Sequence, residues 1–403
     1  MSRLEELIQQ YCPDGVEYRP IWSLTAWDKK FNGIDKSKQK KVIKYNYLLA
    51  ADLKSYQVEG GTVKLLTTNI SNLYTTEELA EDLASDGEVV AIPWGGNPIV
   101  QYYKGRFLTA DNRIATSLDT TLLNNKFLYY CMLSKMKVIA SFYRGSGIKH
   151  PDMSKVLDLE IPVPPLPVQE EIVRILDTLT ELQAELQAEL QKRLQQYNYY
   201  RDNLLSFEGR TDIEWKKLGD VCNFMNGKGH EKSIVENGKY IVVNSKFIST
   251  QGCVRKYSDK QISPLFVGDV LMVMSDLPNG RALAKCFIVD KDNLYTLNQR
   301  ICSLTVKNQN ELLSKYLFYI TNRNRQLLRF DNGVDQTNLK KDDILNILIP
   351  IISIAEQQRI VDILDRFDKL TNDITEGLPA EIEARRKQYE YYRDQLLTFK
   401  QKA

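Results

Sequence analysis

The residues best suited to metal binding or nucleophilic chemistry are few and scattered in this chain. It contains two histidines, His150 and His230, and six cysteines that form no CxxC pair. A zinc site needs closely spaced His and Cys ligands, and acid–base catalysis most often uses His. The sequence therefore predicts neither a metal site nor histidine-based catalysis.

Familiar catalytic and nucleotide-binding motifs are also missing. The segment NGKGHEKS at 226–233 lacks the spacing of a phosphate-binding P-loop. There is no GxSxG, HExxH or protein-kinase signature. Amino-methyltransferases carry a glycine-rich loop and an Asn/Asp-Pro-Pro-aromatic tetrapeptide, and VPPL at 163–166 is the nearest segment here. These observations favour a protein that binds over one that catalyses.

Composition places the chain among ordinary globular proteins of two or three domains. Of its 403 residues, 43% are hydrophobic and 26% are charged. No run of about 18 apolar residues suggests a membrane span, and the acidic start MSRLEELIQQYCPDG does not resemble a signal peptide. Cysteines scattered without a CxxC pair suit a reducing compartment, so we expect a cytoplasmic protein.

One segment is strongly basic. DKKFNGIDKSKQKKVIK at 28–44 holds seven lysines and two aspartates, a balance of 7 − 2 = +5. Such a loop either contacts phosphate groups or is a solvated, mobile surface, and both interpretations stay open from composition alone.

An internal repeat determines the predicted architecture. YNYYRDNLLSF at 197–207 and YEYYRDQLLTF at 389–399 share eight of eleven residues. EIPVPPLPVQEEIVRILDTL at 160–179 likewise matches LIPIISIAEQQRIVDILDRF at 348–367. The chain therefore consists of two units, each a globular part followed by a helical part.

Weaker matches run through the globular parts. They are GEVVAI at 87–92 with GDVLMV at 268–273, KFLYYCM at 126–132 with KYLFYIT at 315–321, VEYRPIWSL at 16–24 with IEWKKLGDV at 213–221, and NRIATSL at 112–118 with QRICSLT at 299–305. The last match gives Arg113 and Arg300 corresponding places, which favours a shared structural role over a separate ligand contact in each part. Strand-like runs among Gly and Asn turns, followed by helical stretches, predict a mixed α/β or α+β fold for both parts.

The helical parts predict long rods. From about Val168 no Pro or Gly appears until Gly209, so about 40 residues would make a helix of roughly 60 Å. Its apolar positions, mostly three or four apart, are Ile172, Ile175, Leu179, Leu182, Leu186, Leu190, Leu194, Tyr197 and Leu204. The second copy carries Ile360, Ile363, Phe367, Leu370, Ile374, Leu378, Ile382, Tyr389, Tyr392 and Leu396. Gly377 is expected to end one helix there and Pro379 to begin another.

The two rods are predicted to pack antiparallel as a coiled-coil spacer, which gives the chain an internal pseudo-twofold repeat. An alternative is a single stalk used for homodimerisation. The expected segments are a first globular domain at 1–159, a first helical region at 160–207, a second globular domain at 208–347 and a second helical region at 348–403.

The doubled helical segments and the doubled tyrosine phrase resemble type I restriction–modification DNA specificity (S) subunits, and CPDGVEY at 12–18 is also similar to members of that family. The resemblance implies two target-recognition domains that read the halves of an asymmetric, interrupted DNA sequence. It implies two modification subunits as partners, which methylate adenine, and restriction subunits that complete an endonuclease. S-adenosylmethionine, ATP and magnesium are expected on those partners, and no cofactor on this chain. The resemblance also implies a prokaryotic protein. The break at Gly377 and Pro379 departs from the first copy.

Lys and Arg should supply phosphate contacts, and Arg, Lys, Asn or Gln should read base edges. The candidate DNA-binding residues of the first globular part are Lys36, Lys38, Lys40, Lys41, Arg144, Lys149 and His150. Those of the second are Lys228, His230, Lys232, Arg281, Arg323 and Arg325. For each of them an exposed, solubilising charge is the alternative, and both histidines are expected on the surface. Candidate partner-binding residues are Tyr199, Arg201, Tyr391 and Arg393, because Tyr and Arg are frequent interface residues.

Two other functions remain open from the sequence. The chain could be a stand-alone methyltransferase or nuclease with an unfamiliar site, or a structural coiled-coil scaffold. Turnover by the purified chain would favour the first, and DNA binding without sequence preference the second.

Overall fold

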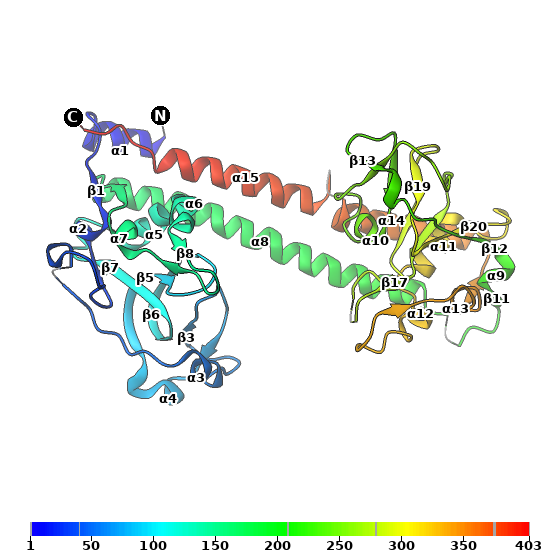
Figure 1. Ribbon diagram of the computed structural model, residues 1–403, viewed down its shortest axis with the longest axis horizontal. Coiled ribbons are helices and arrows are strands. Elements are labelled where there is room, and N and C mark those ends of the chain that lie inside the picture. Colours follow the sequence, from blue (N-terminus) through cyan, green and yellow to red (C-terminus); the bar gives the residue numbers. More distant parts are fainter. Residues whose placement is uncertain (1, 40, 208, 279, 374–375, 403) are drawn as a thin grey trace. The chain divides into compact units, whose positions relative to one another are not determined.

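The computed structural model describes residues 2–39, 41–207, 209–278, 280–373 and 376–402. The chain forms two compact units (Figure 1): unit 1 comprises Met1–Gln187 and Glu381–Ala403, and unit 2 comprises Ala188–Ala380. Each unit combines one globular head with parts of both helical regions. No helix among the described residues is long and apolar enough to cross a membrane. The mixed α/β class predicted from the sequence is confirmed.

Head 1, the globular part of unit 1, contains a six-stranded sheet of order β2-β7-β5-β6-β3-β4, in which only β3 and β6 are parallel neighbours. The strands are β2 (Thr25–Trp27), β3 (Val63–Leu66), β4 (Tyr74–Thr75), β5 (Ser85–Pro93), β6 (Gln101–Thr109) and β7 (Asn112–Ser117). Val90 and Ile92 of β5 enter one core cluster, and Val89 and Ala91 enter another. Both faces of β5 are therefore covered, which explains its continuous apolar run.

Short helices and two small strand pairs complete head 1. The helices are α1 (Arg3–Tyr11), α2 (Ile21–Leu24), α3 (Ala50–Ser55), α4 (Glu77–Ala80), α5 (Asn125–Ser134), α6 (Met136–Ser141) and α7 (Met153–Leu157), with 3-10 turns at Lys36–Lys38 and Glu81–Leu83. The pairs are β1 (Tyr18–Pro20) with β10 (Glu160–Pro162) and β8 (Tyr143–Arg144) with β9 (His150–Pro151). Helix α5 begins where the Asn124 side chain accepts hydrogen bonds from the amides of Lys126 and Phe127.

Head 2, the globular part of unit 2, contains two four-stranded sheets. One has the order β12-β20-β16-β18 and the other β13-β15-β14-β19. The first consists of β12 (Cys222–Asn226), β20 (Ile301–Val306), β16 (Val270–Val273) and β18 (Cys286–Ile288), and the second of β13 (Ile234–Val235), β15 (Tyr257–Ser258), β14 (Tyr240–Val243) and β19 (Tyr295–Leu297). Two further pairs join β11 (Glu214–Lys217) to β22 (Leu348–Ile351) and β17 (Ser275–Asp276) to β21 (Thr337–Asn338). The helices are α9 (Leu218–Val221), α10 (Ser245–Ser249), α11 (Ser314–Thr321), α12 (Arg325–Leu328) and α13 (Lys341–Leu345), with a 3-10 turn at Glu231–Ser233.

The two heads share a framework beneath these differences. Each contains a strand, a four-residue helix and a second strand in succession, namely β1-α2-β2 after α1 in head 1 and β11-α9-β12 in head 2. The second strand enters a sheet in the order β2-β7-β5 in one head and β12-β20-β16 in the other. Helices α5 and α11 follow β7 and β20. Two differently elaborated copies of one framework therefore explain why the sequence repeat is weak in the heads.

Strand register corrects one predicted correspondence. Thr25 and Cys222 both follow the four-residue helix and pair with Ser117 and Val306 respectively. Counted back from these partners, Arg113 corresponds to Cys302 and not to Arg300. Arg113 is 5% exposed, whereas Arg300 is exposed with φ +67° just before β20, so the predicted shared role of the two arginines is wrong.

The helical regions form α8 (Leu166–Leu204), α14 (Ile354–Asn372) and α15 (Leu378–Leu396). The predicted break in the second region is confirmed, but α14 ends at Asn372, before Gly377. Pro379 lies in the first turn of α15, where a missing N–H costs no helical hydrogen bond. The predicted apolar residue Ile374 lies outside the described residues.

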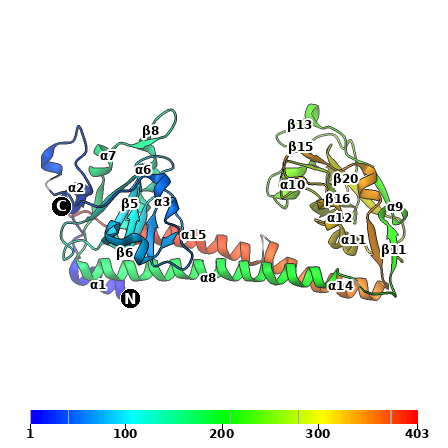
Figure 2. The same cartoon turned by 90° about the horizontal axis from the view of Figure 1, so that it is seen from below.

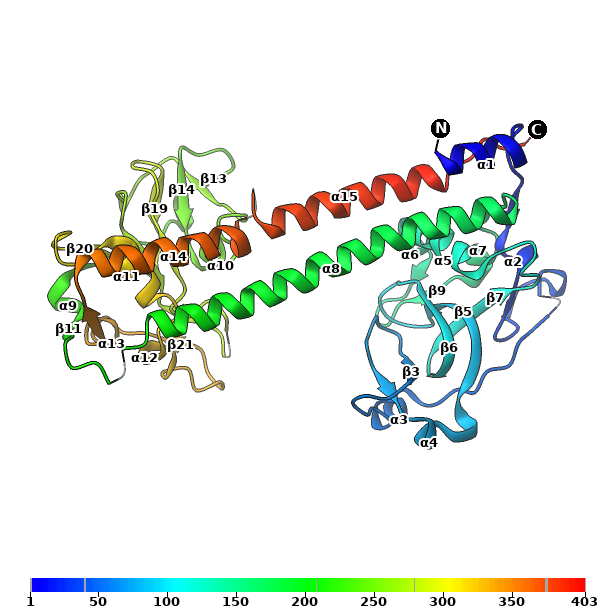
Figure 3. The same ribbon diagram turned by 180° about the vertical axis from the view of Figure 1, so that it is seen from behind.

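Within each unit, parts of two long helices lie side by side (Figures 1 and 3). In unit 1 the first part of α8 and the last part of α15 both pack on the core of head 1, through residues such as Ile172, Leu176 and Leu396. In unit 2 the end of α8 and α14 both pack on the core of head 2, and the rings of Tyr200 and Phe367 stack at 5.3 Å between centroids.

The repeated glutamine fixes each head to the helix that follows it in sequence. Gln169 is fully buried, accepts a hydrogen bond from the amide of Asn124 (2.9 Å) and donates to the carbonyls of Leu122 (2.8 Å) and Pro164 (2.7 Å). Gln357 repeats this arrangement with Leu313, Glu311 and Ile352. A buried amide with all these bonds explains why the residue recurs.

A Lys–Tyr–Asp cluster recurs beside each glutamine. Asp177 accepts hydrogen bonds from Lys126 (2.7 Å) and from the hydroxyl of Tyr130 (2.6 Å). In unit 2, Asp365 accepts from Lys315 and from the hydroxyl of Tyr319 (2.6 Å). Burial and the neighbouring carboxylate raise the pKa of both tyrosines, so their hydroxyls remain protonated donors.

Candidate nucleic-acid interface

In head 1, three loops that are distant in sequence meet around Trp94. The carbonyl of Trp94 lies 2.7 Å from Nδ1 of His150, and the two rings are 5.2 Å apart between centroids. The amide of Gly96 donates to the carbonyl of Lys149 at 3.0 Å. A hollow of about 480 Å³ beside Trp94 is lined by Lys29, Lys30, Phe31, Asn32, Gly33, Ile34, Arg113, Pro151, Asp152, Met153 and Ser154. The structure thus brings the start of the basic segment together with the segment YRGSGIKH at 143–150, which carries Arg144, Lys149 and His150.

A buried ion pair between Arg113 and Asp28 lies beneath the Trp94 ring. The guanidinium of Arg113 lies 4.0 Å from the centre of the Trp94 ring and 4.0 Å from Oδ2 of Asp28. The amide of Ile114 donates to Oδ1 of Asp28 at 2.9 Å. Burial raises the pKa of Asp28, against the opposing effects of the hydrogen bonds from Ile114 and Tyr47 and of the Arg113 charge, and burial lowers the pKa of Arg113, against the opposing effect of the Asp28 charge. Sequence reasoning missed this pair and Trp94, because the lysines alone suggested the interface.

The predicted DNA-binding residues of head 1 differ in whether their side chains are exposed to solvent or already paired within the head. Lys36, Lys41, Arg144, Lys149 and His150 are exposed. Lys38 is already paired with both carboxylate oxygens of Asp158, at 2.6 and 2.8 Å. Lys40 lies outside the described residues. Lys29 and Lys30, which line the hollow, are exposed as well.

In head 2 the predicted residues separate into two groups. Lys228, Lys232 and Arg281 are exposed on loops that follow β12 and β17. Arg323 has φ +59° and donates to the carbonyls of Gly280 (3.3 Å) and Leu283 (3.2 Å), so it braces the loop that carries Arg281. Arg325 pairs with Asp202 at 3.2 Å and lies near the end of α8.

His230 corrects a prediction. Its side chain is 1% exposed, with Nδ1 2.7 Å from the carbonyl of Lys228 and Nε2 2.9 Å from Oγ1 of Thr296. The predictions that His230 is a surface residue and a DNA contact are wrong, because both ring nitrogens are engaged inside head 2.

The loops at issue lie on one side of head 1. Figure 2 shows that the loop beside β8 stands on the side of the head away from α8, with β5 and β6 between them. A surface of exposed lysines and arginines with neighbouring aromatic and amide groups can bind phosphates and base edges. Among the described residues no three His, Cys, Asp or Glu side chains gather as a metal site.

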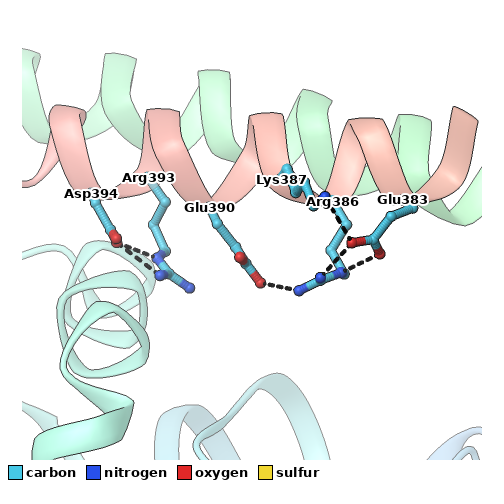
Figure 4. Close-up of polar contacts among 6 residues, drawn as sticks. All are labelled: Glu383, Arg386, Lys387, Glu390, Arg393 and Asp394. Atoms are coloured by element: carbon cyan, nitrogen blue, oxygen red, sulfur yellow. Dashed lines mark hydrogen bonds and ion pairs between the residues drawn. The ribbon is translucent and has the colours of Figure 1, made fainter. Parts of the chain in front are cut away.

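The tyrosine phrase has the same geometry in both copies. Tyr199 is 66% exposed and Tyr391 is 62% exposed, and each ring meets the next tyrosine edge-to-face at 5.6 Å. Arg201 pairs with Asp202 (2.9 Å), as Arg393 pairs with Asp394 (2.8 Å). Figure 4 shows the second pair on α15. The two predicted arginines are thus already paired, whereas the two predicted tyrosines present exposed rings.

The surface of α15 that leads to this phrase is charged. Arg386 contacts Glu383 (2.8 Å) and Glu390 (2.6 Å), and Lys387 lies 3.6 Å from Glu383 (Figure 4). Pairs three and four residues apart face each other on a helix surface and give modest stabilisation to an exposed helix. They also raise the pKa of Arg386, chiefly through its hydrogen bond to Glu383.

Comparisons with known proteins agree with these features. The family model for the type I restriction modification DNA specificity domain matches residues 29–196 and again 211–384. The specificity subunit of the type I restriction enzyme EcoR124I/EcoR124II from Escherichia coli is 35% identical over 311 residues, which cover 71% of this chain and 74% of that protein. A putative type I restriction enzyme specificity subunit from Haemophilus influenzae is 33% identical over 345 residues, covering 80% of this chain and 86% of that protein.

A solved structure shares the fold. The crystal structure of the S subunit of a type I restriction–modification system from M. genitalium superimposes with a TM-score of 0.61 at 17% identity, and covers 95% of this chain and 96% of that one. The two matches to the family model coincide with the two copies of the repeat. The chain therefore belongs to the type I restriction–modification DNA specificity subunits, and its role is specificity and not catalysis.

Proposed function

We propose that the two heads of this chain read the two unlike halves of an interrupted DNA target. The observation that carries the proposal is the convergence of exposed cations from separate loops around Trp94 in head 1. Head 2 presents Lys228, Lys232 and Arg281 on loops that follow β12 and β17, and β12 corresponds to β2 in the shared framework. Because these loops differ in length and sequence between the heads, they suit two different half-sites.

In this proposal α8 contributes the spacer. Its 39 residues correspond to a helix of about 58 Å. Its first part enters the core of head 1 and its last part the core of head 2, so one continuous helix takes part in both. A coiled coil with α14 and α15 would fix the number of unread bases between the half-sites.

The partners are proposed to be two copies of a modification subunit, joined by restriction subunits in the complete enzyme. Two nearly identical exposed tyrosine phrases support two equivalent docking sites. S-adenosylmethionine, ATP and magnesium would then be bound by the partners.

Mapping of methylated adenines in the genome of the host tests the DNA-reading proposal. The expected result is one asymmetric motif with two specified halves and an unspecified gap of constant length, lost when the gene for this chain is deleted. Exchange of head 2 for that of a related subunit should change only one half of the motif. A motif without a gap, or one unaffected by the deletion, would overturn the proposal.

Replacement of Tyr199 or Tyr391 by alanine tests the docking sites. Each exposed ring is expected to contribute as an interface hot spot does, so each change should weaken one of two binding events about 30-fold. Isothermal titration of the chain with the modification subunit should then show one tight and one weak site, and the double variant two weak sites. Leu182→Ala, at a residue 44% exposed in the middle of α8, is the control with unchanged affinities. Equal weakening of both sites by a single change would contradict the assignment.

A further inference from the structure

The loop between β8 and β9 in head 1 carries an exposed aliphatic residue. Ile148 follows Gly147 and is 69% exposed, although isoleucine side chains are usually buried. The loop closes on a two-residue antiparallel pair, Tyr143 with Pro151 and Arg144 with His150. Ile148 is therefore at the tip of a short two-stranded ribbon.

Despite this exposure, Ile148 has a defined position. A Cβ atom added to Gly95 would lie 2.9 Å from Cγ2 of Ile148, so the isoleucine packs directly against the backbone of the Trp94 loop. Gly145 has φ +145°, and a Cβ there would lie 2.6 Å from the carbonyl oxygen of Ile148. Two glycines thus allow the close packing that holds this tip, and the residue is a fixed apolar projection.

The surroundings of Ile148 are cationic. Arg144 at the end of β8 and Lys149, which follows Ile148, are both exposed. Lys29 and Lys30 line a hollow that Pro151 and Asp152 also line. A polyanion therefore fits the surface, whereas a purely apolar partner does not. The ligand must combine phosphates with an apolar group that a narrow tip can reach.

Duplex DNA offers such a group in its major groove. This groove admits a two-stranded β-ribbon, and its apolar feature is the C5-methyl group of thymine, which small apolar side chains contact. If head 1 reads a DNA half-site as proposed above, Ile148 is suited to one contact within it. We propose that Ile148 contacts the methyl group of a thymine in the half-site bound by head 1. Head 2 has a comparable tip, Val334, which is 75% exposed and follows Gly333, but its neighbour is Asp335 and not a cation. The proposal is therefore confined to Ile148.

Substitution of deoxyuridine for thymidine tests the contact, because it removes only the methyl group. Each thymine of the motif found by methylation mapping is replaced in turn, and the affinity of the full-length chain is measured. For the wild-type chain one replacement, in the head 1 half-site, should weaken binding about fourfold, the value of one buried methyl group. Ile148→Ala should bind the unmodified target about fourfold more weakly and show no further loss with that replacement.

Three variants complete the design. Gly95→Ala leaves Ile148 in place in the sequence but pushes its side chain aside, so it should also lose the thymine discrimination. Val334→Ala should retain it. Ile70→Ala, at a residue 77% exposed in another loop of head 1, should retain it too.

The outcomes separate the inference from the proposed function. Unchanged discrimination in Ile148→Ala overturns the inference while the DNA-reading proposal stands. The same holds if Ile148→Ala reduces DNA bending without any methyl dependence, which would make the residue a minor-groove wedge. Failure of the wild-type chain to prefer the mapped motif over random DNA overturns the proposed function, and the inference with it.

Discussion

Simultaneous replacement of Lys29, Lys30 and Lys149 by glutamine is expected to lower DNA affinity about a hundredfold at about 0.15 M salt. All three lysines are exposed, and they belong to the loops that meet at Trp94. Each phosphate contact releases condensed counterions, so its loss should reduce the slope of log affinity against log salt by about 0.9. The loss should be similar for specific and random DNA, because phosphates carry no sequence.

The measurement is a salt titration of DNA binding by the full-length chain. A matched control replaces three exposed lysines of the same head, Lys54, Lys104 and Lys137, by glutamine. It changes the net charge equally but lies outside the three loops, so it should leave the slope nearly unchanged. Equal losses in both triple variants would mean that the overall charge, and not these loops, binds DNA.

The same experiment applies to head 2 with Lys228, Lys232 and Arg281 replaced by glutamine.

Lys38→Gln is expected to have little effect on DNA affinity in head 1, because the carboxylate of Asp158 already binds the ammonium group of Lys38. Comparison of Lys38→Gln with the triple variant of Lys29, Lys30 and Lys149 thus distinguishes a lysine that is paired within the fold from lysines that are exposed to a ligand.

The sequence predicted the parts of the fold where identical residues make identical contacts. Gln169 and Gln357 recur because each closes the same set of buried hydrogen bonds. Asp177 and Asp365 recur because each accepts from a lysine and a tyrosine one turn apart on the same kind of helix. Few other side chains could make the same buried hydrogen bonds at these positions. The two copies therefore kept the same residues there, and the repeat can be recognised in the sequence.

Strand register and burial were harder to predict. The match of NRIATSL with QRICSLT is two residues out of the structural register, since apolar runs buried on both faces contain few residues that mark one register. His230 looked like a surface residue because its partner, Thr296, is 66 positions away. No motif in the sequence marks Trp94, Gly95 or Ile148 as a functional residue. They lie next to one another only because three loops pack together in the folded head.

Composition left open whether the basic segment contacts phosphates or is a solvated surface, and its most informative residues were not chosen as DNA contacts. Lys29 and Lys30 border the hollow, whereas the residues selected from the sequence included Lys38, which is paired internally. Whether a lysine pairs with a carboxylate 120 positions away depends on tertiary structure, and no local pattern reveals it.

The second large effect concerns the buried part of the tyrosine phrase. Leu397→Ala with Phe399→Ala is expected to destabilise unit 1 by about 4–6 kcal/mol. Leu397 is 7% exposed and both residues pack on the core of head 1, where the carbonyl of Phe399 also accepts from the hydroxyl of Tyr18 at 3.1 Å. The backbone beyond them pairs with Val16, whose amide donates to the carbonyl of Lys400 at 2.9 Å.

The first copy of the phrase supplies a matched control with the same chemistry. Leu205 and Phe207 correspond to Leu397 and Phe399 but pack on the core of head 2. Leu205→Ala with Phe207→Ala should therefore loosen unit 2 and spare unit 1. Hydrogen exchange followed by mass spectrometry on the full-length chain distinguishes them: the second-copy variant should lose protection in β5 and β7, and the first-copy variant in β16 and β20.

The expected pattern crosses the order of the sequence. The first copy follows head 1 along the chain, yet its buried residues belong to unit 2, and the second copy follows head 2, yet belongs to unit 1. Loss of protection in the preceding head for either variant would show that the phrase packs on its sequence neighbour. If the crossed pattern is found, the inward residues of each copy stabilise a head while Tyr199 and Tyr391 remain exposed, so one repeated phrase serves the fold and still presents two equivalent surfaces to partners.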